Sequence, residues 1–209
     1  MELLLIRHAL PIRREVTDGP ADPPLSDAGL AQSALLGSYL ASETIDAIYS
    51  SPLRRALQTA APVARGQGLE VAIEDGVAEY DRLANEYIPI EEIKAEGGQA
   101  WKDFTTSNWH GAGAYDSPEE FNTIVIAAIE GLIAAHRGHR IAVVCHGGVI
   151  NGYLAHVLGL EGSGGFFYPN YTSIHRIAAA GSGERSIVTI NETSHLRGSG
   201  LPMGIVQRG

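Results

Sequence analysis

Three short apolar runs are each followed by side chains that could bind or attack an anion. Such continuous runs are typical of strands buried on both faces of a parallel sheet. Ligands of parallel α/β sheets bind outside the carboxyl ends of the strands, so we expect these side chains to meet at one edge. Two imidazoles and several guanidiniums together require an anion such as phosphate among them. The runs are residues 2–6, followed by Arg7 and His8; residues 46–49, followed by Arg54 and Arg55; and residues 140–145, followed by His146.

The two histidines could perform different parts of one phosphoryl transfer. A neutral imidazole such as His8 can attack phosphorus and form a phosphohistidine, provided that it is unprotonated and held in one tautomer. Guanidiniums beside the ring disfavour its protonated form. His146 precedes Gly147 and Gly148, where the free N–H groups of a helix start can point towards an anion. A protonated His146 would add positive charge where the transferring phosphoryl group needs it.

The arginine pair and a group of acids complete the candidate chemistry. A cation in the first turn of a helix opposes the helix dipole at a cost of about 0.3–1 kcal/mol. An oxyanion that bridges the guanidinium and the helix N-terminus removes this conflict, which suits one arginine of the pair and leaves the other solvated. A leaving oxygen also needs a proton donor. Spacing does not choose among the acids that follow the strand predicted over residues 69–73: Glu74, Asp75, Glu79 and Asp81.

Composition restricts the partners and the surroundings of the chain. Of its 209 residues, 44% are hydrophobic and 19% are charged, which is enough apolar material for a folded core. The net charge of −9 would repel nucleic acid, so any basic pocket is local. The single cysteine, Cys145, excludes an intrachain disulfide and a cysteine-based zinc site. Without an apolar stretch of bilayer length or a recognisable signal peptide, we expect a cytoplasmic protein that contacts no membrane.

The alternation of strand and helix patterns predicts a three-layer α/β/α fold with a mostly parallel central sheet. Ser26, Ser51 and Ser117 are each predicted to cap the N-terminus of a helix. Two strands in a hairpin are expected over residues 172–178 and 186–191.

Residues 75–117 interrupt this alternation and mix acids, aromatic residues and glycines. They are predicted to form a lid-like insertion over the site, with one helix near residues 89–104. With this insertion, residues 1–209 are expected to form a single domain.

Three motifs, in this order along the chain, resemble those of the histidine phosphatase superfamily, also called phosphoglycerate-mutase-like. The resemblance extends from residue 2 to about residue 196. Arg7-His8 is similar to the family's Arg-His-Gly signature; residues 49–59 (Tyr-Ser-Ser-Pro-Leu-Arg-Arg-Ala-Leu-Gln-Thr) are similar to its second motif; and residues 143–150 (Val-Val-Cys-His-Gly-Gly-Val-Ile) are similar to its third.

The resemblance implies a role for each of these motifs, without a metal or a cofactor. His8 would be the nucleophile, and Glu79 would be the proton donor. The arginine of the second motif that precedes alanine is Arg55, which leaves Arg54 as the solvated neighbour. The groups implied to bind the phosphoryl group and stabilise its charge are Arg7, His8, Arg55, His146 and the backbone of Gly147.

The chain departs from the family pattern near the first motif. Ala9 stands where the signature has glycine, and Arg14 stands where an asparagine is often found. Arg13 and Arg14 are therefore candidates for contact with the substrate, against the alternative that both are solvated. The chain also lacks the extra length and C-terminal tail of the mutases, which favours hydrolysis.

We therefore predict a metal-independent phosphomonoester hydrolase that acts through a phosphohistidine on His8. The expected substrate is a small phosphorylated metabolite or a phosphopeptide, and the sequence leaves the oligomeric state open, a homodimer included. Two alternatives are phosphoryl transfer of the phosphoglycerate mutase type and a non-catalytic protein that binds phosphorylated ligands. A hydrolase with a histidine-ligated metal has less support, because the histidines and carboxylates lack close metal-ligand spacing.

Overall fold

The computed structural model describes residues 1–105, 115, 117–160 and 165–205. Its central sheet has six strands: β1 (Glu2–Arg7), β3 (Ala47–Ser50), β4 (Val71–Ile73), β6 (Arg140–Cys145), β7 (Ile174–Ala179) and β8 (Arg185–Glu192). Their order across the sheet is β4-β3-β6-β1-β7-β8. The first four are mutually parallel, whereas β7 runs antiparallel to β1 and to β8. The mostly parallel sheet and the C-terminal hairpin are thus confirmed.

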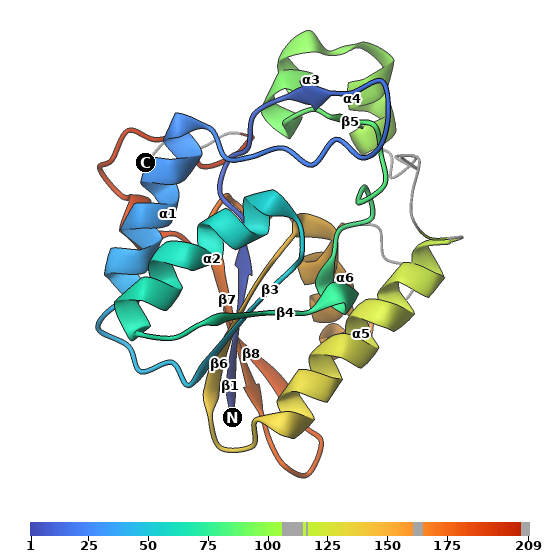
Figure 1. Ribbon diagram of the computed structural model, residues 1–209. Helices are drawn as coiled ribbons and strands as arrows, with labels where there is room; N and C mark the ends of the chain where they lie inside the picture. Colours follow the sequence, from blue (N-terminus) through green and yellow to red (C-terminus); the bar gives the residue numbers. More distant parts are fainter. Residues whose placement is uncertain (106–114, 116, 161–164, 206–209) are drawn as a thin grey trace.

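Helices cover both faces of this sheet, which confirms the three-layer prediction (Figure 1). Alternate side chains of a strand point to opposite faces, so Leu4 of β1 packs with α1 and α2 while Leu5 packs with α5 and α6. Both leucines are fully buried. None of the described helices combines the length and the apolar character needed to cross a membrane. The four helices that cover the sheet are α1 (Asp27–Leu40), α2 (Arg54–Gln67), α5 (Pro118–Ala135) and α6 (Gly147–Leu158).

A smaller group of elements, here named the cap, lies beyond the carboxyl end of β1 (Figure 1). It consists of β2 (Arg14–Glu15), β5 (Glu86–Tyr87), α3 (Ile90–Glu96) and α4 (Gly98–Thr105). Strands β2 and β5 pair antiparallel, so the loop after β1 is joined to the predicted insertion. Residues 106–114 and 116 of that insertion lie outside the described part of the chain.

The prediction of one continuous helix near residues 89–104 was wrong. Gly97 and Gly98 have φ angles of +67° and +73°, a left-handed backbone that a right-handed helix cannot contain. The segment therefore divides into α3 and α4. A short 3₁₀ turn, η1 (Asp75–Val77), begins the insertion, and another, η2 (Ser194–Leu196), follows the hairpin.

Two of the three predicted helix caps are confirmed, because the Ser26 and Ser117 hydroxyls each accept a backbone N–H of their own helix. The prediction for Ser51 was wrong. Helix α2 begins at Arg54 and has no side-chain cap within its own N-terminal segment. The carboxylate of Asp22 instead accepts the Arg54 backbone N–H at 2.9 Å, which leaves the Ser51 hydroxyl available for another partner.

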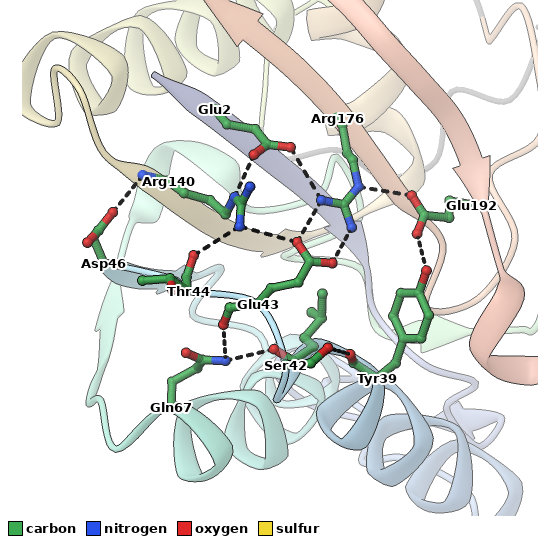
Figure 2. A network of polar contacts seen from close by, with 11 residues as sticks. Glu2, Tyr39, Ser42, Glu43, Thr44, Asp46, Gln67, Arg140, Arg176 and Glu192 are labelled. Carbon is green, nitrogen blue, oxygen red and sulfur yellow. Dashed lines mark hydrogen bonds and ion pairs between the residues drawn. The ribbon is translucent and has the colours of Figure 1, made fainter.

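A network of ion pairs joins the four sheet strands β1, β6, β7 and β8 to the loop that follows α1 (Figure 2). Arg176 of β7 lies at its centre and contacts Glu43 at 2.6 Å, Glu192 at 2.9 Å and Glu2 at 3.3 Å. Arg140 of β6 contacts Glu43 at 3.6 Å and also pairs with Glu2. Hydrogen bonds from Arg176 lower the pKa of Glu43 despite the opposing effect of burial. The network therefore holds carboxylates ionised in a half-buried place.

Replacing Arg176 with methionine should destabilise the fold by about 2–3 kcal/mol near neutral pH, because Glu2, Glu43 and Glu192 lose a shared cation. The pKa of Glu43 is depressed in the folded state. Its contribution is therefore complete above the unfolded glutamate pKa of about 4.3, and it is lost as the pH falls through the depressed value.

Urea unfolding of wild type and Arg176→Met at about pH 7 and about pH 3 measures this difference. The exposed Arg197, which has only a backbone hydrogen bond among the contacts of the described residues, provides the control Arg197→Met. An equal deficit at both pH values would show that Arg176 stabilises the fold by packing alone.

Candidate active site

The parallel pairing of β1 with β6 places two histidines side by side. Arg7 lies opposite Cys145 in this pairing, so the residues that follow, His8 and His146, leave their strands at the same level. Their ring centroids are 5.0 Å apart, and both side chains are buried. The structure thus brings together the ends of two strands that are separated by most of the chain.

The His8 ring is oriented by the residue that follows it. Its Nδ1 lies 2.8 Å from the carbonyl oxygen of Ala9, so a neutral ring donates from Nδ1 and keeps its lone pair on Nε2. Burial in the first place, and then Arg55 and Arg7, hold the pKa of His8 well below its usual value. The imidazole is therefore neutral at pH 7, and its exclusion from water contributes more to this than the arginines that the sequence pointed to.

Ala9 takes the place of the signature glycine without backbone strain. Among the described residues, positive φ angles outside glycine occur at Thr172 and Asn191, so Ala9 needs no left-handed backbone. Its N–H donates to the Thr59 hydroxyl at 2.9 Å. This bond ties the strand end that carries His8 to helix α2.

His146 is oriented by Ser51, the residue predicted as a helix cap. Its Nε2 lies 2.8 Å from the Ser51 hydroxyl oxygen, which also accepts the Leu53 backbone N–H at 3.2 Å. The hydroxyl proton is thus free to point at Nε2, which leaves the ring proton on Nδ1. Burial, with Arg55, holds the pKa of His146 well below its usual value. The lowered pKa favours a neutral ring that offers an N–H donor, rather than the positive charge of a protonated His146.

Arg7 is held between a carbonyl group and two aromatic rings. One terminal nitrogen donates to the Pro169 carbonyl oxygen at 2.6 Å. The guanidinium carbon lies 4.2 Å from the ring centroid of Tyr171 and 4.8 Å from that of Tyr168, which is cation–π geometry. Its Nε is buried without a hydrogen-bond partner.

Arg55 of helix α2 is buried near His8 and His146, whereas Arg54 is exposed. A terminal nitrogen of Arg55 donates to Asp81 at 2.8 Å, and the guanidinium lies 4.7 Å from the ring centroid of Tyr87. Its Nε is also buried and unpartnered. Of the arginine pair, the structure therefore turns Arg55 towards the histidines.

Two of the four candidate acids lie at this site. The Glu79 carboxylate accepts the Gly148 backbone N–H at 2.8 Å, and Asp81 contacts the guanidinium described above. Glu74 instead caps η1, and Asp75 is exposed. Burial first, and then Asp81, raise the pKa of Glu79. Glu79 therefore keeps a proton to higher pH than an ordinary carboxyl group, as a general acid must.

Unpartnered N–H groups converge between these side chains. Four buried side-chain polar atoms of the described residues lack a partner, and three of them are Arg7 Nε, Arg55 Nε and His146 Nδ1. Buried donors without acceptors are costly, so this place is suited to a ligand with several negatively charged oxygens. Gly147 lies beside these unpartnered donors, since a Cβ added to Gly147 would lie 3.9 Å from Arg7 Nε. The described residues contain no cluster of three histidine, cysteine or acidic side chains suited to a metal ion.

Several side chains around the site could not be identified from the sequence. Ser51 carried a signal, since it follows a buried strand, but the sequence assigned it to a helix cap. Tyr87, Tyr168 and Tyr171 carried none, because they come from the cap and from the segment before β7. Arg13 lies in ion pairs with glutamates of the cap and is not brought to the histidines, whereas Arg14 pairs across from Tyr87.

Known proteins share both the sequence pattern and the fold. The model of the histidine phosphatase superfamily (branch 1) matches residues 3–193. Phosphoserine phosphatase 1 of Hydrogenobacter thermophilus is 39% identical over 97 residues, which span 44% of this chain and 45% of that protein. The putative phosphoserine phosphatase 2 of the same organism is 28% identical over 213 residues, which span 93% of this chain and 97% of that protein.

Solved structures of similar fold include a mutant phosphoserine phosphatase from Entamoeba histolytica in complex with phosphoserine. It has a TM-score of 0.72 and 24% identity, and 93% of this chain and 98% of that chain are covered. A mycobacterial glucosyl-3-phosphoglycerate phosphatase in complex with inorganic phosphate has a TM-score of 0.74 and 21% identity, with the same coverage.

Substituting alanine for Gly148 should displace the Glu79 carboxylate and leave the fold intact. The added Cβ would lie 2.3 Å from Glu79 Oε1, and the carboxylate would have to leave the Gly148 N–H. Because that hydrogen bond lowers the pKa of Glu79, its loss should raise the pKa further. A carboxyl ¹³C NMR titration measures the shift. The control is Gly131→Ala in α5, where a Cβ meets open space; an unchanged titration in Gly148→Ala would contradict the assigned contact.

Proposed function

The chain belongs to the histidine phosphatase superfamily, and we propose that it hydrolyses phosphomonoesters through a phosphohistidine intermediate on His8. The observation that carries this proposal is the convergence of three unpartnered buried N–H groups beside the His8 ring. A phosphoryl group supplies the oxygens that these donors lack. The ring itself supplies a neutral nucleophile whose Nε2 has no hydrogen bond to a described residue.

The first step transfers the phosphoryl group to the protein. His8 Nε2 attacks phosphorus, so an N–P bond forms while the bond to the leaving oxygen breaks. Protonated Glu79 gives its proton to that oxygen, and an alcohol departs. In the second step the Glu79 carboxylate takes a proton from water, whose oxygen attacks phosphorus. The N–P bond breaks, inorganic phosphate forms, and His8 and Glu79 return to their initial states.

The charge of the phosphoryl oxygens is stabilised by groups that are in position beforehand. Arg7 and Arg55 are fixed by aromatic faces and by one polar partner each. The Ser51 hydroxyl supports the tautomer of His146 that donates from Nδ1. Together with the backbone N–H of Gly147, these donors surround the transferring group. Donors held in place before the reaction lower the barrier without a cost of reorganisation.

The substrate that we propose is a small phosphorylated metabolite. This is supported by relatives named for phosphoserine and for glucosyl-3-phosphoglycerate. A phosphopeptide is the alternative substrate. Mutase chemistry would use the same phosphohistidine but return the phosphoryl group to the product, so net release of phosphate separates the two functions.

His8→Ala should lower phosphate release by at least about 10³-fold, because the covalent intermediate cannot form. The assay is phosphate release from a panel of phosphorylated metabolites and phosphopeptides, with His139→Ala as the control, since His139 is exposed and remote from the site. Labelled substrate quenched in alkali should leave an acid-labile phosphoryl label on His8 in the wild type. Turnover without this label would overturn the covalent mechanism, and isomerised product without free phosphate would identify a mutase.

Glu79→Gln should lower kcat/KM for an alkyl phosphate by about 10²–10⁴-fold, because glutamine cannot protonate the leaving oxygen. It should affect p-nitrophenyl phosphate much less, since nitrophenolate leaves without a proton. Wild-type kcat/KM for the alkyl phosphate should fall as the pH rises through the raised pKa of Glu79, and this decline should be absent in the variant. Glu74→Gln, outside the site, is the matched control; equal losses on both substrates would exclude Glu79 as the acid.

A further inference from the structure

The two neighbouring arginines of the loop after β1 lie on opposite faces of the cap ribbon. Arg14 is directly opposite Tyr87 in the antiparallel pairing of β2 with β5, and side chains of directly opposite residues share a face. The Tyr87 ring contacts the Arg55 guanidinium, so this face is the one turned towards the site. Successive residues of a strand alternate between faces, so Glu15 lies on the other face. Arg13, which precedes β2, is directed to this outer face, because it contacts Glu15 at 3.1 Å.

The two arginines differ in their ion-pair partners. On the outer face, Arg13 is neutralised by Glu96 at 2.7 Å, Glu15 at 3.1 Å and Glu92 at 3.6 Å. On the inner face, Arg14 is half-buried, and no hydrogen bond or ion pair joins its side chain to a described residue. Arg14 therefore lacks the counter-charge that the described residues give to Arg13. This contrast favours a ligand that supplies the negative charge on the inner face.

We propose that Arg14 binds a carboxylate of the substrate, so that the preferred substrates are small phosphorylated carboxylic acids. This rests on the proposed function, which places the phosphoryl group beside Arg55. One unpaired guanidinium balances one monoanionic group, and its planar fork matches a carboxylate in a bidentate manner. Tyr87 contacts Arg55 and is paired with Arg14, so a small substrate could present its phosphoryl group to one arginine and its carboxylate to the other.

Pairs of substrates that differ by one carboxylate test this proposal. They are 3-phosphoglycerate against glycerol 3-phosphate, and O-phosphoserine against O-phosphoethanolamine. The wild type should prefer the carboxylate member of each pair. Arg14→Gln should lower kcat/KM for the carboxylate members by about 10–100-fold, mainly through KM, as expected for loss of a charged hydrogen-bonded pair. It should change the other members by less than about twofold.

Arg13→Gln is the matched control, since it removes the same charge from the neighbouring position on the outer face. It should affect both members of a pair equally. Equal losses on both members in Arg14→Gln, or no loss on either, would overturn the carboxylate assignment. Thermal unfolding of each variant shows whether the ribbon remains folded, because the backbone pairing of β2 does not need the side chain.

Failure of the proposed function is distinguishable from failure of this inference. If wild type and His8→Ala release phosphate from the whole panel at the same rate, the hydrolytic function fails. Calorimetric binding of 3-phosphoglycerate and glycerol 3-phosphate to wild type and Arg14→Gln then still tests the carboxylate contact. A selective loss of 3-phosphoglycerate affinity supports it, and unchanged relative affinity overturns it.

Discussion

The register between β1 and β6 is the constraint on which the site depends. Because Arg7 is paired with Cys145, His8 and His146 emerge at one level and their rings lie 5.0 Å apart. The neighbouring strand β3 continues the alignment, since the Ser51 N–H donates to the Val144 carbonyl at 3.0 Å. A slip of one residue would turn the side chains of one strand to the other face and separate His8 from His146.

Buried positive charge is balanced differently in two parts of the structure. Around Arg176, three carboxylates surround one guanidinium, and the ion pairs hold strands together. At the candidate site, Arg7 has a carbonyl group and two aromatic rings, and Arg55 has a single carboxylate, that of Asp81. Among the described residues, positive charge is thus less completely balanced at the candidate site than around Arg176, in a chain whose net charge is −9.

The sheet and the cap contribute different parts of the site. The strand ends and helix starts supply the proposed nucleophile, His8, and the N–H groups proposed to bind the phosphoryl group. The cap is anchored to this machinery through Glu91, which accepts the Tyr171 hydroxyl at 3.0 Å, and through Tyr87 against Arg55. It also carries Arg14 on its inner face. In the proposed function, the reaction therefore takes place at the sheet, and the proposed carboxylate contact comes from the cap.

The sequence by itself determined the order of strands and helices and the side chains at the strand ends, because apolar runs and caps such as Ser117 are local signals. Spacing did not separate Glu79 from the other acids, although the family resemblance pointed to it, and the sequence did not identify the partner of Ser51 or distinguish Arg14 from Arg13. The contact between Glu79 and Gly148 joins residues 69 positions apart, and that between Ser51 and His146 joins residues 95 positions apart. Only the tertiary structure decided these assignments, since each depends on which distant segment lies opposite, and local propensity carries no information about that.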